Sequence, residues 1–205
     1  MANPTIFVML WSLMVSIPNS NARKEGAANE ELAWFQNICT TTGKEKVVKL
    51  HFFLQDVQAG INETVFEVAR ASISENSPSN FGLVRVLDDL VTAGPEKDSE
   101  KLGRAQGTIA YIDLETSALG MNLNIVFTAG PYNGSTLCIL GRNPITVDKR
   151  ELPVVGGTGI FRMARGYVIG NTYAYDPYTE YGVLEYNAYV SYFDDSSIRT
   201  LQGDQ

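Results

Sequence analysis

The sequence predicts an all-β fold, either a barrel or a sandwich of short strands. Apolar and polar residues alternate with a period of two from Val47 onward, which is typical of strands with one buried face. Turn-forming pairs divide these segments, and no long helical pattern interrupts them, which argues against parallel βαβ units. A closed barrel leaves no exposed sheet edge, and a barrel of about eight strands can hold one small ligand.

Each strand candidate lies between turn residues. The candidates in chain order are 47–56, 81–89, 104–113, 119–128, 134–141, 150–155, 159–169, 171–176 and 183–193. The turn pairs between and around them are Ala59-Gly60, Gly94-Pro95, Gly130-Pro131, Asn133-Gly134, Gly156-Gly157 and Asp176-Pro177.

Two acids extend the apolar faces of predicted strands. Asp56 continues the face that ends at Leu54, and Asp88 continues the face of Val84 and Val86. An acid in this place would lie at the mouth of an apolar cavity, where desolvation raises its pKa and allows proton transfer near neutral pH. A strand-end or turn cap is the alternative for both acids, and spacing alone does not decide between them.

The N-terminus has the pattern of a secretory signal. The apolar run from Ile6 to Ile17 is too short to span a bilayer, and Ser20-Asn21-Ala22 fits a signal-peptidase site. We therefore expect a secreted, extracellular protein. Its expected parts are a signal peptide at 1–22, an N-terminal arm at 23–46, the barrel domain at 47–194 and a C-terminal tail at 195–205.

Two sequons fit a secreted glycoprotein. Asn62 and Asn133 each begin an Asn-x-Ser/Thr triplet, and both are predicted glycosylation sites. The chain has two cysteines, Cys39 and Cys138. A disulfide between them is possible, but we favour a free, buried Cys138 because it lies within an apolar run.

Charge and motifs exclude several functions. The net charge of −7 and the lack of a Lys/Arg cluster disfavour nucleic acid and anionic membranes as partners. His51 is the only histidine, so a histidine metal site or a Ser-His-Asp triad is not expected. The run from Gly156 to Gly159 lacks the lysine of a phosphate loop and is predicted to be a β-turn. We expect no metal and no cofactor.

Several ordered motifs between residues 46 and 193 resemble those of the plant dirigent family. They are LHFFLQD at 50–56, VLDDLVT at 86–92, GRAQG at 103–107, YNGSTL at 132–137, GRNP at 141–144 and RELPVVGGTGIFR at 150–162, followed by ARGY at 164–167. The resemblance implies an eight-stranded antiparallel β-barrel of the dirigent and allene-oxide-cyclase-like type. It also implies secretion to the apoplast and a homotrimer, with a dimer as the alternative.

The resemblance implies control over phenolic chemistry. Typical members orient two phenoxy radicals, such as those of coniferyl alcohol, while a separate laccase or peroxidase makes the radicals, and the products are optically active lignans. The stretch from Tyr132 to Tyr167 is more similar to the pterocarpan-synthase branch. Its members dehydrate isoflavanols through a quinone-methide-like intermediate, which needs an acid for the leaving hydroxyl and a base for the phenol.

The positions that match the family's motifs give the expected site residues. The resemblance implies Asp56, Tyr111 and Arg150 as pocket residues with catalytic roles, and Asp88 of the paired-acid motif as a further candidate. An ion pair of Arg150 with Asp56 or Glu151 that only shapes the wall is the alternative for Arg150.

Two departures from the family pattern bear on function. Asn143 stands where pinoresinol-forming members carry an acid, which argues against coupling by the usual acid pair. Gln55 stands where many members carry histidine beside the pocket acid, which changes the hydrogen bonding there.

Three functions remain open from the sequence. The first is a guide for radical coupling that has no oxidising activity of its own. The second is a dehydratase or cyclase that acts on an isoflavanol or a similar phenolic. The third is a secreted phenolic-binding protein of the cell wall or of defence that has no turnover.

Overall fold

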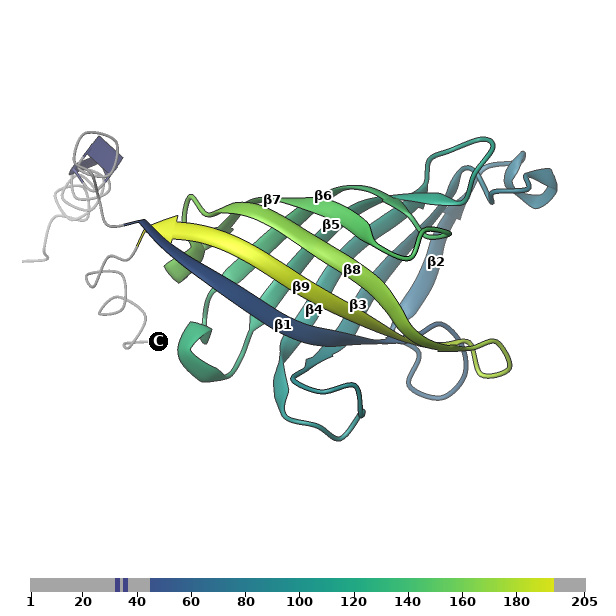
Figure 1. Cartoon of the computed structure of the whole chain (residues 1–205). Helices are drawn as coiled ribbons and strands as arrows, with labels where there is room; N and C mark the ends of the chain where they lie inside the picture. The colour runs from purple at the N-terminus through teal and green to yellow at the C-terminus, as the bar shows by residue number, and fades with distance from the viewer. Residues whose placement is uncertain (1–31, 34, 37–44, 194–205) are drawn as a thin grey trace, which may run out of the picture. The chain divides into compact units, whose positions relative to one another are not determined.

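The structure, a computed structural model of the whole chain, describes residues 32–33, 35–36 and 45–193 (Figure 1). The expected signal peptide, the C-terminal tail and Cys39 lie outside the described residues. The four described residues of the expected arm are helical and belong to a separate unit, Met1–Thr42. No helix in the described part of the chain has the length and apolar character needed to cross a bilayer.

The second unit is a barrel of antiparallel strands. In chain order the strands are β1 (Glu45–Val57), β2 (Val65–Arg70), β3 (Leu83–Thr92), β4 (Lys101–Tyr111), β5 (Ala118–Phe127), β6 (Thr136–Pro144), β7 (Arg150–Thr158), β8 (Arg165–Asp176) and β9 (Tyr181–Phe193). Short 3-10 turns follow β2, β5 and β7: η1 (Ser74–Asn76), η2 (Gly130–Tyr132) and η3 (Gly159–Phe161).

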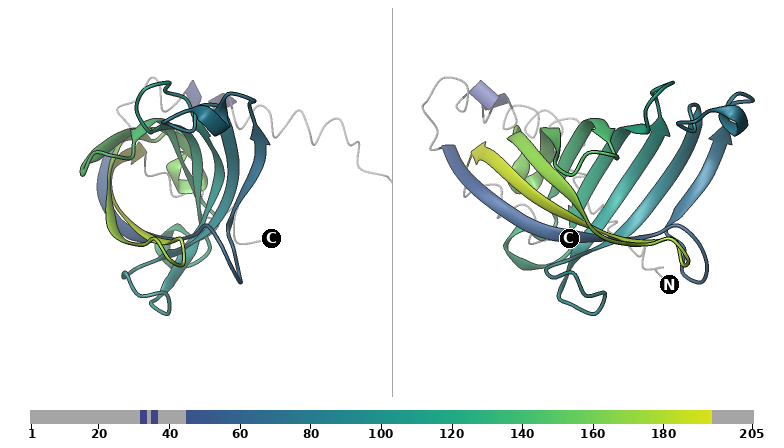
Figure 2. Two further views of the ribbon diagram at one scale, coloured as in Figure 1. Left: turned by 90° about the vertical axis from the view of Figure 1, so that its right-hand side faces the viewer. Right: turned by 45° about the vertical axis from the view of Figure 1, so that its right-hand side comes forward.

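The sheet closes on itself through β1 and β3. The strand order is β1-β9-β8-β7-β6-β5-β4-β3, and β1 also pairs with β3, which completes a ring of eight strands. β2 pairs only with β3 among the described strands and stands outside the ring. The left view of Figure 2 looks along the closed ring. The prediction of an eight-stranded antiparallel barrel is confirmed.

Aromatic residues fill one end of the barrel. Phe161 of η3 is fully buried, and its ring lies 5.0 Å from that of Tyr132, 5.6 Å from that of Phe127 and 5.6 Å from that of Tyr192. In Figure 2 this short turn lies inside the ring. The same buried core includes aliphatic residues such as Leu137, Ile139 and Leu152, and a cavity lies toward the other end of the barrel.

Three segments differ from the predicted elements. β2 was missed because its apolar residues Val65, Phe66, Val68 and Ala69 fall on both faces, so that no alternation of apolar and polar residues signals a strand. The candidates 159–169 and 171–176 form one strand, β8, after the η3 turn. The glycine pair predicted as a turn, Gly156-Gly157, belongs to the end of β7, where the pairing with β6 shifts register.

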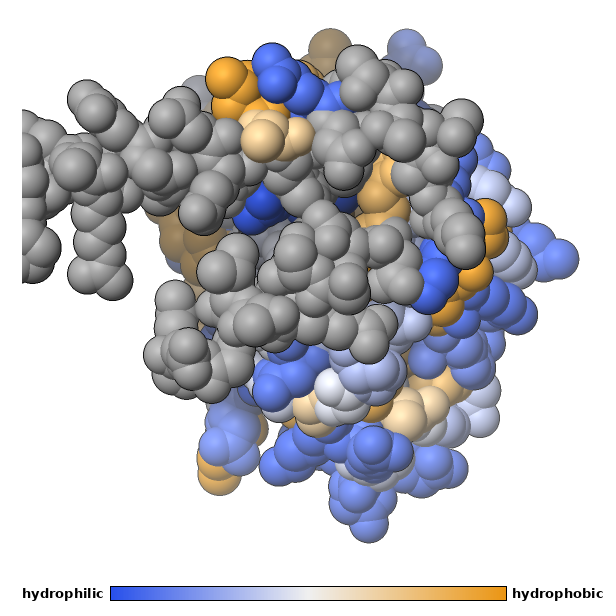
Figure 3. All heavy atoms as spheres, turned by 90° about the vertical axis from the view of Figure 1, so that its left-hand side faces the viewer, coloured by the Kyte–Doolittle hydropathy of each residue, from blue (hydrophilic) through white to orange (hydrophobic). Residues whose placement is uncertain are grey.

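The outer wall carries both hydrophilic and exposed apolar side chains. Hydrophilic residues dominate the described surface in the face shown in Figure 3. His51 lies on this outer wall, where its Nε2 is 2.8 Å from Glu185 Oε1. Cys138 is free, as expected, but it is only half-buried, because it faces outward and donates to Asn124 Oδ1 at 3.2 Å.

Close packing between β4 and β5 depends on a glycine, and we expect Gly107→Ala to destabilise the barrel. A Cβ at Gly107 would lie 1.9 Å from the carbonyl oxygen of Asn122 on β5, so the strands would have to separate. We predict a loss of about 1–3 kcal/mol in the free energy of unfolding, measured by urea denaturation. Gly182→Ala is the control, since its Cβ would meet only ordinary contacts at 3.6 Å. Equal effects of the two changes would contradict this account.

Candidate functional site

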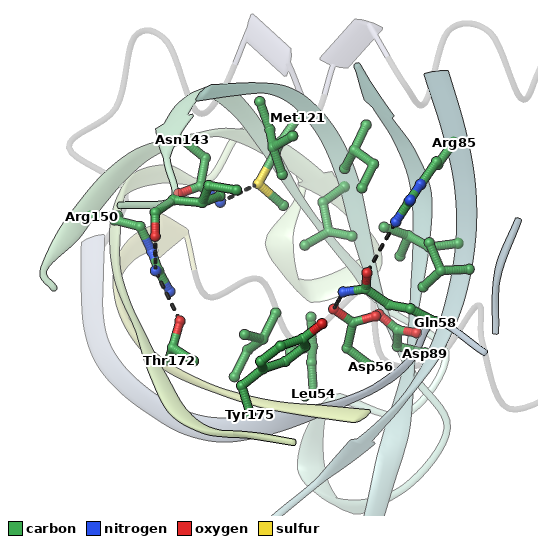
Figure 4. Close-up of a pocket in the computed structure, with 18 of the residues that line it drawn as sticks. Leu54, Asp56, Gln58, Arg85, Asp89, Met121, Asn143, Arg150, Thr172 and Tyr175 are labelled. Atoms are coloured by element: carbon green, nitrogen blue, oxygen red, sulfur yellow. Dashed lines mark hydrogen bonds between the residues drawn. The ribbon is translucent and has the colours of Figure 1, made fainter. Parts of the chain in front are cut away.

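The hollow end of the barrel holds a cavity of about 440 Å³ (Figure 4). Its apolar lining comes from the inward faces of β1, β4, β5 and β9 and includes Leu54, Ile109, Met121 and Leu184. The polar lining side chains are those of Asp56, Gln58, Arg85, Asp89, Tyr111, Asn143, Arg150, Thr172, Tyr175 and Tyr186. A cavity that combines an apolar lining with polar groups directed into it is typical of sites for small organic ligands.

Two carboxyl groups lie side by side where the barrel closes. β1 and β3 pair with Leu54 opposite Val91 and Gln55 opposite Leu90, so the next step of this register sets Asp56 opposite Asp89. Figure 4 shows the two carboxyl groups adjacent on one wall of the cavity. Asp89 is only 2% exposed, and Asp56 Oδ1 is buried without a hydrogen-bond partner.

The segment between β1 and β2 supplies a hydrogen-bond donor to each acid. Gln58 Nε2 donates to Asp56 Oδ2 at 3.0 Å, while Gln58 Oε1 accepts from Arg85 Nη1 at 3.0 Å. Thr64 Oγ1 donates to Asp89 Oδ1 at 2.5 Å. One short segment therefore holds both carboxyl groups in place.

Burial raises the pKa of both acids. For Asp56, desolvation raises the pKa, while the Gln58 hydrogen bond and the Arg85 charge partly oppose that rise. For Asp89, desolvation and then the neighbouring Asp56 charge raise the pKa to about 8. Two adjacent carboxylates cannot both ionise at low cost in a desolvated place, so the pair retains a proton near neutral pH.

A buried cation lies on the opposite wall. Arg150 is 5% exposed, and its Nη1 donates to Thr172 Oγ1 at 3.0 Å and to the carbonyl oxygen of Ile145 at 3.3 Å. Within the described residues no carboxylate lies within 4.0 Å of this guanidinium, so the suggested ion pair with Asp56 or Glu151 is absent. Figure 4 shows Arg150 across the cavity from the acid pair.

Two further polar residues line the cavity. Asn143 Nδ2 donates to Met121 Sδ at 2.9 Å, and its Oδ1 is buried without a partner. Tyr186 is buried, and desolvation raises its pKa to about 12, although Arg150 lowers it somewhat. An accepting Asn143 Oδ1 and an un-ionised Tyr186 hydroxyl can orient a polar ligand by hydrogen bonds.

The structure brings three of the four proposed catalytic residues to one cavity. Asp56, Tyr111 and Arg150 all line it. Asp88 does not, because it points to the outer wall, where Arg104 Nε donates to its Oδ1 at 2.7 Å. The predicted alternation of β3 was therefore wrong by one residue, and Asp89 takes the inward place instead.

Several residues of the site were missed from the sequence, among them Asp89, Arg85 and Gln58. Asp89 was one position away from the proposed Asp88. Arg85 lies within the predicted strand 81–89 and interrupts its apolar residues, but the sequence did not show that it faces the cavity. Gln58 follows the end of β1 and gave no signal in the sequence.

The predicted sequon residues are accessible. Asn62 is exposed in the β1–β2 segment, and Asn133 is exposed beside η2. The Thr64 hydroxyl of the first sequon is the group that donates to Asp89. Gln55 lies on the opposite face of β1 from the cavity and donates to Thr92 Oγ1 at 2.8 Å, so it does not bond to the cavity acid.

Comparison with known proteins now identifies the family. A family model for dirigent-like proteins matches residues 47–191. The chain belongs to the dirigent family. It is 42% identical to dirigent protein 21 of Arabidopsis thaliana over 71% of this chain and 77% of that protein. It is 38% identical to pterocarpan synthase 1 of Glycine max over 73% of this chain and 81% of that protein.

The dirigent barrel also matches a solved structure. The structure of a pterocarpan synthase dirigent protein superimposes with a TM-score of 0.69 at 40% sequence identity and covers 74% of this chain and 88% of that one. The closed ring of this chain is thus the dirigent fold.

The buried acid of the dirigent site gives a pH-dependent stability. Folded Asp89 keeps its proton up to a pKa of about 8, whereas the unfolded side chain releases it near 3.8. Raising the pH between these values therefore favours the unfolded chain, with a slope that approaches about 1.4 kcal/mol per pH unit. We predict that the wild type loses stability from pH 4 to pH 8 and that Asp89→Asn lacks this loss. The difference in the free energy of unfolding, measured by urea denaturation at each pH, should therefore shift progressively in favour of the variant.

The matched control for this measurement is Asp88→Asn, since Asp88 is an exposed neighbour of the same charge. Its stability should follow the wild type across the range. If both variants showed the same pH dependence, Asp89 would not be the buried proton carrier.

Proposed function

We propose that this protein is a stereoselective, cofactor-free dehydratase or cyclase for a phenolic alcohol. The supporting observation is the opposed polarity of the cavity. A carboxyl pair that retains a proton lies on one wall, and a guanidinium without a carboxylate partner lies on the other. This is the charge arrangement that quinone-methide formation needs, because a cation can hold the substrate as its phenolate on one side while the leaving hydroxyl takes a proton on the other.

The proposed reaction begins with a substrate bound as its phenolate. Arg150 holds the phenolate oxygen, and the protonated carboxyl of the Asp56–Asp89 pair lies at the benzylic hydroxyl. The carboxyl gives its proton to that hydroxyl, the C–O bond breaks and water leaves. Electrons from the phenolate oxygen form the quinone methide, so that the ring oxygen becomes a carbonyl oxygen bound to Arg150.

Ring closure returns the carboxyl pair and the bound phenolate to their starting protonation states. A second phenolic hydroxyl of the substrate attacks the benzylic carbon and forms the new C–O bond. Its proton returns to the carboxylate, and the quinone methide becomes a phenolate again. The net change is loss of one water, and the barrel wall sets the face of attack because it holds both rings while the bond forms.

Guidance of phenoxy-radical coupling is the second candidate. The chain is 42% identical to dirigent protein 21 and 38% identical to a pterocarpan synthase. Sequence identity alone therefore does not favour the synthases over the other dirigent proteins. Coupling of the pinoresinol type uses a pair of acids, and Asn143 occupies one of those two positions here, so that pair is incomplete. The Asn143 amide, in place of the expected acid, also fits dehydration better.

Secretion, glycosylation and assembly remain proposals. The sequence pattern at 1–22 supports secretion, and the exposure of Asn62 and Asn133 is compatible with glycans there. A homotrimer, or a dimer, is supported by exposed apolar side chains on the outer wall of β3 and β6, such as Val86 and Leu140.

One assay panel tests the function. The protein is incubated with a racemic isoflavanol without oxidant, and separately with coniferyl alcohol plus a laccase, followed by chiral chromatography. We expect a cyclised, dehydrated product of one handedness in the first reaction. Optical enrichment only in the second would show a coupling guide and overturn the proposal. Binding without turnover in both would leave a phenolic-binding protein.

Substitutions of two lining residues should have graded effects. Asp56→Asn removes one member of the carboxyl pair, and we expect kcat/KM to fall about 100-fold or more while the fold and oligomeric state stay unchanged. Tyr111→Phe removes one lining hydroxyl that can form a hydrogen bond with the ligand, and we expect a loss of about 2- to 10-fold. Steady-state kinetics with circular dichroism and size-exclusion chromatography check both. Full activity of Asp56→Asn would refute the acid–base assignment.

A further inference from the structure

Gln58 stands between a cation and an acid that would otherwise pair. Arg85 and Asp56 both line the cavity, and each bonds to the same amide at 3.0 Å. The guanidinium reaches the amide oxygen, and the amide nitrogen reaches the carboxyl (Figure 4). No direct ion pair between Arg85 and Asp56 is present in the described residues.

We propose that Gln58 is a positioning residue that keeps the Arg85 guanidinium off the Asp56 carboxyl, so that the acid pair stays available to exchange a proton with the ligand. This inference rests on the proposed function of the cavity. An amide serves this purpose because it offers a donor to the acid and an acceptor to the cation and has no charge of its own.

A direct contact would act differently on the acid. An arginine–carboxylate pair is a charge-assisted and often bidentate interaction, stronger than the hydrogen bond of a neutral amide. It would hold Asp56 as a carboxylate paired with Arg85. The negative charge that helps Asp89 retain its proton would then be neutralised, and the pair would lose that proton at lower pH.

Other groups around the acids do not duplicate this role. From β3, Asp89 faces Asp56, and from β9 Tyr186 faces it at longer range. From β8, Tyr175 lies near Asp56, since a Cβ added at Gly182 would touch both at 3.6 Å. Arg85 is the cation whose charge acts on Asp56, whereas Arg104, which pairs with Asp88 on the outer wall, lowers the pKa of Asp89. The separation of Arg85 from Asp56 therefore depends on Gln58.

The two roles that Gln58 can have predict opposite shifts. If Gln58 only donates a hydrogen bond to the Asp56 carboxylate, its removal makes the carboxylate less stable, and the acid titrates at higher pH. If Gln58 separates the charges, its removal lets Arg85 pair with Asp56, and the acids titrate at lower pH. The direction of the shift distinguishes the two without any substrate.

The test follows the carboxyl groups by carbon-13 NMR of aspartate-labelled protein across pH, with signals assigned from Asp56→Asn and Asp89→Asn. We expect Gln58→Ala and the near-isosteric Gln58→Met to shift the titration of the pair to lower pH. Adding Arg85→Met to either variant should shift it back to the wild-type position or above. Gln106→Ala, at an exposed glutamine of the outer wall, is the control and should leave it unchanged.

The activity of the same variants completes the test. With an isoflavanol, we expect Gln58→Ala to lower kcat at neutral pH about tenfold or more and to shift the pH profile toward acid, and Arg85→Met to reverse that shift. A titration that moves to higher pH, or does not move, overturns the inference. If the NMR shift appears while no variant turns over isoflavanol, the charge separation stands and the proposed reaction is wrong.

Discussion

The structure depends on three backbone pairs between β1 and β3, which close the sheet into a ring. Without them the strands would form an open, twisted sheet with two unpaired edges, and no enclosed cavity would exist. The same pairs set the register that brings Asp56 opposite Asp89. Closure of the fold therefore also assembles the acid pair.

The cavity retains unfavourable electrostatics that the rest of the barrel must offset. The carboxyl pair must keep a proton that it would release in water, and a buried guanidinium without a carboxylate is costly as well. The plugged end of the barrel supplies the compensation, because the Phe127–Phe161 cluster and the aliphatic residues beneath it are fully buried. The aromatic end of the barrel therefore provides stability, and the other end holds the reactive groups.

The fold was accessible from the sequence because alternation is strong where only one face is buried. β1, β5 and β9 show this, since Leu54, Leu123 and Tyr186 face inward as the pattern predicts. β3 does not, because Val84 and Val86 on its outer face are also apolar, and the pattern could not tell which face was inside. That ambiguity directed the prediction to Asp88, and only the ring closure identifies Asp89.

The alternation of the strands also makes the two surfaces of the wall separately variable. Inward residues such as Leu87 and Ile109 shape the chamber, while their sequence neighbours contact only the exterior. Substitutions of inward residues can therefore adapt the cavity to a different ligand without changing the contacts of the outer surface. Such independence would let gene duplication generate many substrate preferences from one scaffold, and it offers the same freedom to enzyme engineering.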